Sequence, residues 1–290
     1  MILTSVVPWF GSKRSLGPVV AKQLGRHSAY FDPFCGSLAV PFAKEESAHE
    51  TINDLHGDLI NLCRLVASDD APRFYERLQR VLCCEDLFND ARNALKSPFD
   101  LPESGFDFDR AKDYFVASWV GRNGVSGTER IDYQMAVRWT PGGGHGGVRF
   151  RSAVESIPAW HERMRRMIIL SRNGFTILER IEDVEGVAIY LDPPYLRGTR
   201  TGCRYVHDFE DRSGGLFGDD HERLAKLANR FERARVVVSY YADPRLKRLY
   251  PEPRWTHIDC SGKKHLHNAV RRGIGAKEAP EVLIVNGPAL

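Results

Sequence analysis

The 290-residue sequence has little that would place it in a membrane or outside the cell. No apolar run approaches the roughly 20 residues that a membrane-spanning helix requires. The first residues, MILTSVVPWF, include a short apolar run, but no basic segment precedes it and no small-residue cleavage site follows it. These absences argue against an integral membrane protein and against a secreted protein, so we expect a cytoplasmic one.

The sequence also lacks a recognisable pattern of metal ligands or disulfides. Its cysteines form no CxxC pair and no cysteine–histidine spacing that suits zinc. We therefore predict a protein without a metal site, whose cysteines are reduced and mostly buried. Cys35 falls in a predicted loop, and of all the cysteines we expect it to be the most reactive. The six cysteines are Cys35, Cys63, Cys83, Cys84, Cys203 and Cys260.

A strong excess of charge of one sign is missing as well, because the formal net charge is only +3. The charges are nevertheless unevenly distributed. Residues 149–172 contain six arginines and two glutamates, and residues 261–272 contain four basic residues and no acid. Two such clusters in a nearly neutral chain are what a surface that binds a polyanion requires. An ordinary solvated surface is the alternative.

Short apolar runs alternate with helical patterns at both ends of the chain. Near-continuous apolar strings of this kind are typical of strands that are covered on both faces in a parallel sheet. The pattern predicts helices over residues 57–68 and 219–231, and with the strands it predicts an open, doubly wound α/β sheet. The expected strands are 29–31, 50–53, 175–178, 187–191, 234–241 and 281–285.

The middle of the chain shows no such alternation. Residues 85–113 are rich in acids, and residues 121–148 hold many glycines, including the run PGGGHGG. We predict an inserted, mainly helical domain over residues 71–166, with a flexible loop or hairpin. The insertion would divide the sheet domain into a first part, residues 1–70, and a second part, residues 167–290.

Three aspartates stand where predicted strands end, which is where ligands bind in a doubly wound sheet. Asp32 precedes a short loop in which Gly36 allows a close approach of backbone to ligand. Asp54 follows Asp32 by 22 residues, a usual place for a carboxylate that accepts both hydroxyls of a ribose. A loop without GxGxxG suits a nucleoside without a pyrophosphate, although Asp54 could instead cap a helix.

The segment PWFGSKRSLGP precedes the first expected strand. Trp9 offers a flat aromatic face, Gly11 permits close approach of the backbone, and Lys13 supplies a cation. Together they could hold an aromatic base and a carboxylate, or they could form a surface turn before a helix.

The third aspartate begins the tetrapeptide Asp192-Pro193-Pro194-Tyr195. The two prolines lack N–H groups and fix φ, so the carbonyls of Asp192 and Pro193 are left as rigid acceptors beside the Asp192 carboxylate. Tyr195 adds an aromatic face. Two fixed acceptors and a stacking ring suit an exocyclic amine with two N–H donors, which makes a plain turn the weaker interpretation.

Four segments together resemble the Dam-like, D12 class of adenine-N6 DNA methyltransferases: PWFGSK, YFDPFCGS, INDLHGDLINL and YLDPPY, in this order. The resemblance implies a Rossmann-like class I methyltransferase sheet with helices on both faces and an inserted target-recognition domain. It implies S-adenosylmethionine as cofactor, double-stranded DNA as partner, no metal, and a bacterial or phage origin; we expect a monomer. Protection from a restriction nuclease, marking of a genome and a phage role all stay open.

The resemblance also assigns residues. Trp9, Lys13, Asp54 and Asp192 match cofactor-contacting positions, Asp32 and Gly36 lie in the cofactor loop, and Asp192, Pro193, Pro194 and Tyr195 form the catalytic motif. The chain departs from the family at Leu38, where the loop usually has a second glycine, and at Ser12, where glycine is common. The change at Leu38 could tighten or shift the cofactor pocket.

Target recognition is expected in the insertion, because arginine and asparagine make bidentate contacts to guanine and adenine. The candidates for base edges are Arg122, Asn123, Arg138 and the glycine-flanked loop up to Arg149. The arginines from Arg149 to Arg172, Arg151 among them, would contact phosphates together with Lys263 and Lys264.

Three alternatives remain open from the sequence. An RNA adenine methyltransferase could use the same chemistry on an unpaired base, although the insertion favours duplex DNA. A nicotinamide-dependent oxidoreductase would share the sheet, but the missing GxGxxG argues against it. A non-catalytic DNA-binding relative is disfavoured because all four residues of the DPPY motif are present.

Overall fold

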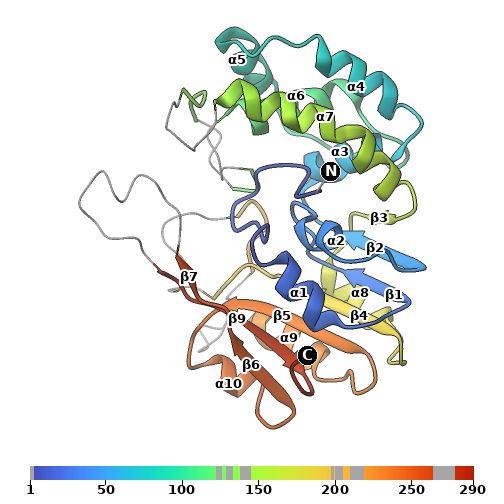
Figure 1. Ribbon diagram of the computed structural model, residues 1–290, viewed down its shortest axis with the longest axis vertical. Coiled ribbons are helices and arrows are strands. Elements are labelled where there is room, and N and C mark those ends of the chain that lie inside the picture. Colours follow the sequence, from blue (N-terminus) through green and yellow to red (C-terminus); the bar gives the residue numbers. More distant parts are fainter. Residues whose placement is uncertain are drawn as a thin grey trace.

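Figure 1 shows the computed structural model, which has a twisted sheet in its lower part and a group of helices above it. The structure describes residues 3–121, 126–128, 133–137, 145–196, 199, 205–209, 219–263 and 278–290. Within this part of the chain, no helix is long and apolar enough to cross a membrane.

The main sheet has seven strands in the order β3-β2-β1-β4-β5-β9-β6. All neighbours are parallel except β9, which runs antiparallel to both β5 and β6. A separate pair, β7 (Gly262–Lys263) and β8 (Glu278–Ala279), forms a small antiparallel ribbon. The strands of the main sheet are β1 (Ala29–Asp32), β2 (His49–Asn53), β3 (Ile168–Leu170), β4 (Val187–Leu191), β5 (Arg235–Tyr241), β6 (Trp255–Asp259) and β9 (Glu281–Asn286).

Helices cover both faces of this sheet, as predicted (Figure 1). Strand β4 shows why its sequence is apolar throughout, because successive side chains point to opposite faces. Ala188 and Tyr190 pack with α1 (Gly17–Leu24) and α2 (Ala39–Ala43). Val187, Ile189 and Leu191 instead share a core with α8 (Gly174–Arg180), α9 (Asp219–Ala228) and α10 (Leu246–Leu249).

A third core holds the helical group together. Its aromatic centre includes Phe74, Phe115 and Trp160, all buried. Leu62 of α3 belongs to the same core, so the group packs directly onto the helix that follows β2. The region is mainly helical, as predicted, while its boundaries at residues 71 and 166 stay a prediction. The helices are α3 (Gly57–Ala67), α4 (Ala71–Gln79), α5 (Glu85–Ala94), α6 (Phe108–Val120) and α7 (Gly146–Met164).

The strand predicted over residues 175–178 is wrong, because these residues lie in α8. Asn173 caps this helix by accepting a hydrogen bond from the Phe175 N–H at 2.9 Å. A four-residue apolar run fits either a strand or a buried helix, and the cap decides for the helix. The neighbouring edge strand is β3, which the prediction did not include.

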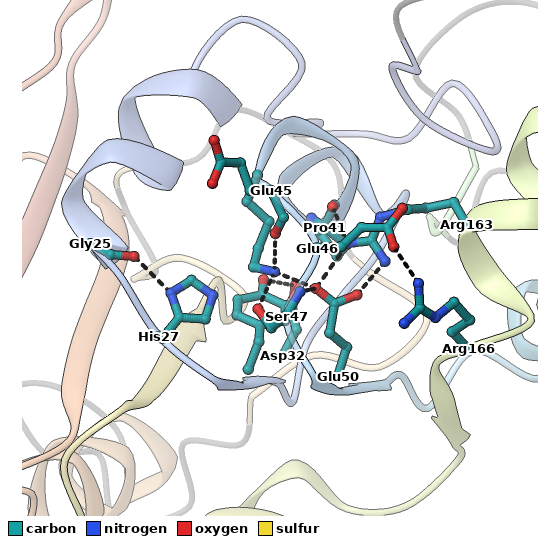
Figure 2. A network of polar contacts seen from close by, with 12 residues as sticks. Gly25, His27, Asp32, Pro41, Glu45, Glu46, Ser47, Glu50, Arg163 and Arg166 are labelled. Carbon is teal, nitrogen blue, oxygen red and sulfur yellow. Dashed lines mark hydrogen bonds and ion pairs between the residues drawn. The ribbon is translucent and has the colours of Figure 1, made fainter.

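A buried ionic cluster fastens α7 to the sheet (Figure 2). Glu50 of β2 accepts hydrogen bonds from Lys44 and from the guanidinium of Arg163, and the lysine and glutamate side chains are only 2% and 3% exposed. Arg163 also donates to the Pro41 carbonyl at 3.1 Å. Arg163 is therefore a structural residue, and its predicted role as a phosphate contact is wrong.

Candidate active site

One cavity of about 570 Å³ opens at the carboxyl ends of β1, β2 and β4. Its size lies within the range of small-molecule sites. The structure brings predicted residues from four distant segments to its wall, whereas Pro193 and Tyr195 are buried outside the lining. The predicted residues that line it are Trp9, Lys13, Asp32, Gly36, Asp54, Asp192 and Pro194.

Lys13 and Asp192 form an ion pair, with 2.9 Å between the lysine Nζ and Oδ2 of the aspartate. The same ammonium donates to the Gly11 carbonyl at 2.9 Å and lies 4.9 Å from the centre of the Tyr195 ring. The lysine of the N-terminal segment thus contacts two residues of the DPPY motif directly. The pair lies close to the surface of the cavity, since the Asp192 side chain is 21% exposed.

The pKa values of Lys13 and Asp192 reflect their burial and the negative charge of Glu281 nearby. Burial raises the pKa of Asp192 to about 6, a shift that the charge and hydrogen bond of Lys13 oppose and the charge of Glu281 reinforces. Burial alone would lower the pKa of Lys13, but the charges of Asp192 and Glu281 raise it above its usual value. Lys13 is therefore a firmly held cation beside an acid that titrates near neutrality.

Asp32 ends β1 and is 2% exposed. Its Oδ2 accepts a hydrogen bond from the Tyr30 hydroxyl at 2.9 Å, while its Oδ1 is buried without a partner among the described residues. Burial, with the charges of Asp192 and Asp54 nearby, raises the pKa of Asp32 well above its usual range. An unsatisfied acceptor of this kind is what a ligand donor or cation would complete.

Asp54 ties the glycine loop to the start of α3. Its Oδ2 accepts from the Gly36 N–H at 3.0 Å and its Oδ1 from the His56 N–H at 2.9 Å. The helix cap is His56, whose Nδ1 accepts from Leu59 N–H at 3.3 Å, so Asp54 is not the cap. Each carboxylate oxygen has a second lone pair, so both can still accept a hydroxyl of a ligand.

The departure at Leu38 has a visible consequence. Leu38 adopts a left-handed conformation with φ of 61°, which glycine reaches freely and other residues at a cost of about 1–2 kcal/mol. Its side chain is fully buried in the helical core and does not line the cavity. The substitution thus keeps the glycine-like backbone and directs the added side chain away from the pocket.

Trp9 is held between two glycines. A Cβ on Gly36 would lie 3.1 Å from the Trp9 Nε1, and a Cβ on Gly127 would lie 2.4 Å from its ring. Gly127 has φ of 83° and belongs to a segment that pairs with the N-terminal motif, where the Phe10 N–H donates to the Ser126 carbonyl at 3.2 Å. Sequence reasoning missed Gly127, because nothing in the sequence relates it to Trp9.

The segment after the DPPY motif closes another side of the cavity. Tyr205, Val206 and Phe209 line it, and the Val206 N–H donates to the Gly127 carbonyl at 3.1 Å. Phe209 packs edge-on against Phe34 of the glycine loop, with 5.8 Å between the ring centres. Tyr205, Val206 and Phe209 were not predicted as site residues.

The expected reactivity of Cys35 is not supported. Cys35 lies in the predicted loop and lines the cavity, but it is 7% exposed. Burial, with the charges of Asp54 and Asp32, raises the pKa of its thiol well above the usual value. Because the thiolate is the reactive form, the position makes Cys35 inert.

Several residues that were predicted to contact DNA, at bases or at phosphates, fall outside the described part of the chain. Arg122, Asn123, Arg138 and Lys264 lie there, and of Lys263 only the backbone is described. Arg151 donates to the Gln79 and Val81 carbonyls after α4, at 2.8 and 2.7 Å. Arg149 donates to the Trp119 carbonyl at 3.4 Å. The roles of these arginines in DNA binding stay predictions.

Within the described residues, no group of three histidine, cysteine or acidic side chains could hold a metal ion.

The sequence model of the D12 class N6 adenine-specific DNA methyltransferases matches residues 9–118. The chain is also 25% identical over 291 residues to the Retron Ec67 DNA adenine methylase of Escherichia coli, an alignment that covers 98% of this chain and 92% of the relative. The predicted resemblance is confirmed, and with it the predicted enzyme class.

Proposed function

We propose that the protein, as an adenine-specific DNA methyltransferase, transfers the methyl group of S-adenosylmethionine to N6 of an adenine that is extruded from double-stranded DNA at specific sites. The observation that carries this proposal is the cavity of about 570 Å³ at the carboxyl edge of the sheet. Residues that the sequence separates by more than 180 positions, from Trp9 to Asp192, meet in its wall.

The cavity wall suits a cationic nucleoside. S-adenosylmethionine supplies an activated methyl group on a sulfonium cation. Asp32 offers a buried Oδ1 that lacks a partner among the described residues, and Asp54 offers the free lone pairs of a carboxylate to ribose hydroxyls. Trp9 presents an aromatic edge and face, and Gly36 keeps the loop backbone close to the ligand.

The DPPY motif would hold the amine that is methylated. The Asp192 carboxylate faces the cavity, and the Pro193 carbonyl accepts no hydrogen bond from any described residue. These two acceptors would bind the two N6 hydrogens and stabilise the positive charge that develops on the nitrogen. Because both reactants are held in place, much of the rate would come from their positioning.

Lys13 occupies the place that this amine requires. Its ammonium bonds to Asp192 and lies over the ring of Tyr195, the two groups assigned to the adenine. An entering base would therefore displace the ammonium from Asp192 and from the Tyr195 ring, which is only 5% exposed with Lys13 in place. Stacking on the uncovered ring would offset part of the cost of extruding the base. Lys13 would then be free to pair with another acid at the cavity.

Site recognition is proposed for the helical group, through Arg122, Asn123, Arg138 and Arg149, with Arg151 as a contact to phosphate. What supports it is the location of Arg149 and Arg151 on α7, outside the sheet that builds the cavity. We further propose a monomer in the cytoplasm of a bacterium, encoded by the host or a phage; the relative from Escherichia coli supports the bacterial setting.

The test is methyl transfer from labelled S-adenosylmethionine to duplex DNA and, separately, to RNA. We expect label on N6 of adenine in duplex DNA, at a defined sequence that mapping of the modified sites would give. Asp192→Ala should lower the rate by at least about 10²–10³-fold, the usual cost of removing a group that stabilises developing charge. Label on RNA alone, on cytosine alone, or on no substrate would contradict the proposal.

A further inference from the structure

Glu281 is the first residue of β9 and comes from a part of the chain to which no site role was assigned. Strand β9 is antiparallel to β5, and Glu281 pairs with Tyr241 at the end of that strand. An antiparallel strand begins where its parallel neighbours end, so its first side chain reaches the carboxyl edge of the sheet. This topology brings Glu281 to the DPPY motif.

The Glu281 carboxylate fixes the hydroxyl end of Tyr195. The Tyr195 hydroxyl donates to Oε2 of Glu281 at 2.8 Å and lies 3.1 Å from the Ser239 Oγ. The ring is 5% exposed and packs edge-on against Tyr241, with 4.6 Å between the ring centres. Tyr195 therefore cannot tilt or shift without breaking a charge-assisted hydrogen bond, and the packing of Tyr241 restrains the plane of its ring.

The charge of Glu281 also acts on the ion pair above this ring. It raises the pKa of both Lys13 and Asp192. Asp192 is coupled to several ionisable groups among the described residues, because their charges shift its pKa or its charge shifts theirs. These groups are Lys13, Asp32, Tyr190, Tyr195, Tyr240 and Glu281.

We infer that Glu281 is a positioning residue of the methyl-transfer site, which orients Tyr195 for stacking on the target adenine and sets the charge of the Lys13–Asp192 pair. The inference rests on the proposed function, because it takes Tyr195 and Asp192 as the holders of the adenine. Glu281 acts through these residues and does not itself line the cavity.

A purely structural role in the sheet would give a different result. Strand β9 is joined to β5 by backbone hydrogen bonds, which a change of side chain leaves in place. Glu281→Gln keeps an acceptor for the Tyr195 hydroxyl and removes the charge, whereas Glu281→Ala removes both. Tyr195→Phe removes the donor and keeps the ring. Comparing the three separates the hydrogen bond from the charge.

For Glu281→Ala we expect kcat to fall by on the order of 10²-fold, as for a misplaced reacting group, with KM for S-adenosylmethionine within about threefold of the wild type. The double variant with Tyr195→Phe should be no slower than the slower single variant, because both changes break one contact. Glu185→Gln, an exposed acid before β4, is the charge-matched control and should behave as the wild type.

The dependence of kcat/KM on pH distinguishes the two roles, because a purely structural role of Glu281 in the sheet would leave it unchanged. The wild type should lose kcat/KM as Asp192 is protonated, with an apparent pKa near 6. Glu281→Gln should move this limb to lower pH, because a neighbouring negative charge is gone. Unchanged kcat and an unmoved limb in Glu281→Gln and Glu281→Ala would overturn the inference.

A second measurement keeps the inference separate from the proposed function. Titration of the Asp192 carboxyl carbon by NMR, in the wild type and in Glu281→Gln, needs no methyl transfer. A lower Asp192 pKa in the variant supports the link between the two acids, and equal values reject it. A wild type that methylates nothing would reject the proposed function alone.

Discussion

Two lysine–carboxylate pairs are buried at opposite edges of the same sheet. Glu50 lies near the start of β2 and pairs with Lys44, whereas Asp192 follows the end of β4 and pairs with Lys13. All four side chains are mostly inaccessible to water, the most exposed being Asp192 at 21%. The two pairs nevertheless differ in how their charges are balanced.

We call the edge with Glu50, Lys44 and Arg163 the closed edge, and the edge with Asp192 and Lys13 the open edge. At the closed edge, each of the three charged side chains has several hydrogen-bond partners (Figure 2). Glu50 accepts from Lys44, from the Ser47 N–H at 3.0 Å and twice from Arg163. Burial alone would raise the pKa of Glu50, but the hydrogen bonds from Arg163 and Lys44 hold it below its usual value. The folded protein therefore prefers the ionised acid.

At the open edge, acids outnumber the cation. Lys13 pairs with Asp192, the charge of Glu281 acts on both residues, and burial raises the pKa of Asp192 to about 6. Above pH 6 Asp192 is ionised, but the folded protein holds this ionised acid at a cost relative to the unfolded chain. The same pair of residue types fastens the fold where it is saturated with partners, and leaves acceptors ready for a ligand where it is not.

The largest expected effect is at the closed edge. Glu50→Ala would leave Lys44 and Arg163 buried without an acid and should lower the free energy of unfolding by about 3–5 kcal/mol. Urea denaturation followed by circular dichroism measures this loss. Arg166→Ala is the control, because Arg166 is 68% exposed and pairs with Glu46 on the surface, where about 0–1 kcal/mol is usual. Equal losses in the two variants would contradict a special role for the buried cluster.

A change at the open edge should weaken ligand binding without unfolding the protein. Gly127→Ala would place a Cβ 2.4 Å from the Trp9 ring, and we expect overpacking to weaken S-adenosylmethionine binding by about 1–3 kcal/mol, seen by calorimetry. Gly105→Ala is the matched control: its φ of 75° gives a similar backbone strain, but its Cβ would meet nothing within 4 Å. If both variants bind the cofactor equally, Gly127 does not position Trp9.

The two edges also differ in how far the sequence foretold them. Asp192 was predicted because the prolines beside it restrict its backbone, and Lys13 because the N-terminal segment matches a family motif. Gly127 and Glu281 were not, because their importance comes from contacts between segments that only the folded chain brings together. Arg163 was misassigned for the same reason, since charge composition does not tell a buried arginine from an exposed one.

The strands and helices show a similar limit. Strand β4 and helix α3 were predicted correctly, because a long apolar run and a strong helical period leave little choice. Residues 175–178 were misjudged as a strand, because four apolar residues fit both states and the Asn173 cap was not weighed. The edge strand β3 was not predicted, because it has only three residues and follows a segment rich in arginine.

A smaller effect concerns the excess of acids over cations at the open edge. It is unusual because removing a charged group there should stabilise the protein. Asp192→Asn mimics the protonated acid that the fold favours, so it should raise the free energy of unfolding at pH 7.5 by about 1–2 kcal/mol while abolishing methyl transfer. Glu50→Gln should do the opposite and destabilise the protein. Chemical denaturation of both variants at one pH compares them directly, and a destabilised Asp192→Asn would refute the imbalance.

The gain in Asp192→Asn should also depend on pH in a defined window. The Asp192 pKa is about 6 in the folded protein against 3.8 in the unfolded chain, so between these values the folded state binds more protons and stability falls as pH rises. Asp192→Asn lacks this slope, and its advantage should therefore be near zero at pH 4, grow up to pH 6 and stay constant above it. Glu50, whose pKa is lowered, contributes stability that is present above its unfolded value and lost only as pH falls through its folded one. Unfolding free energies of the wild type and of Asp192→Asn, measured from pH 4 to 8, would reveal the window; a difference that is independent of pH would show that the gain does not come from the charge of Asp192.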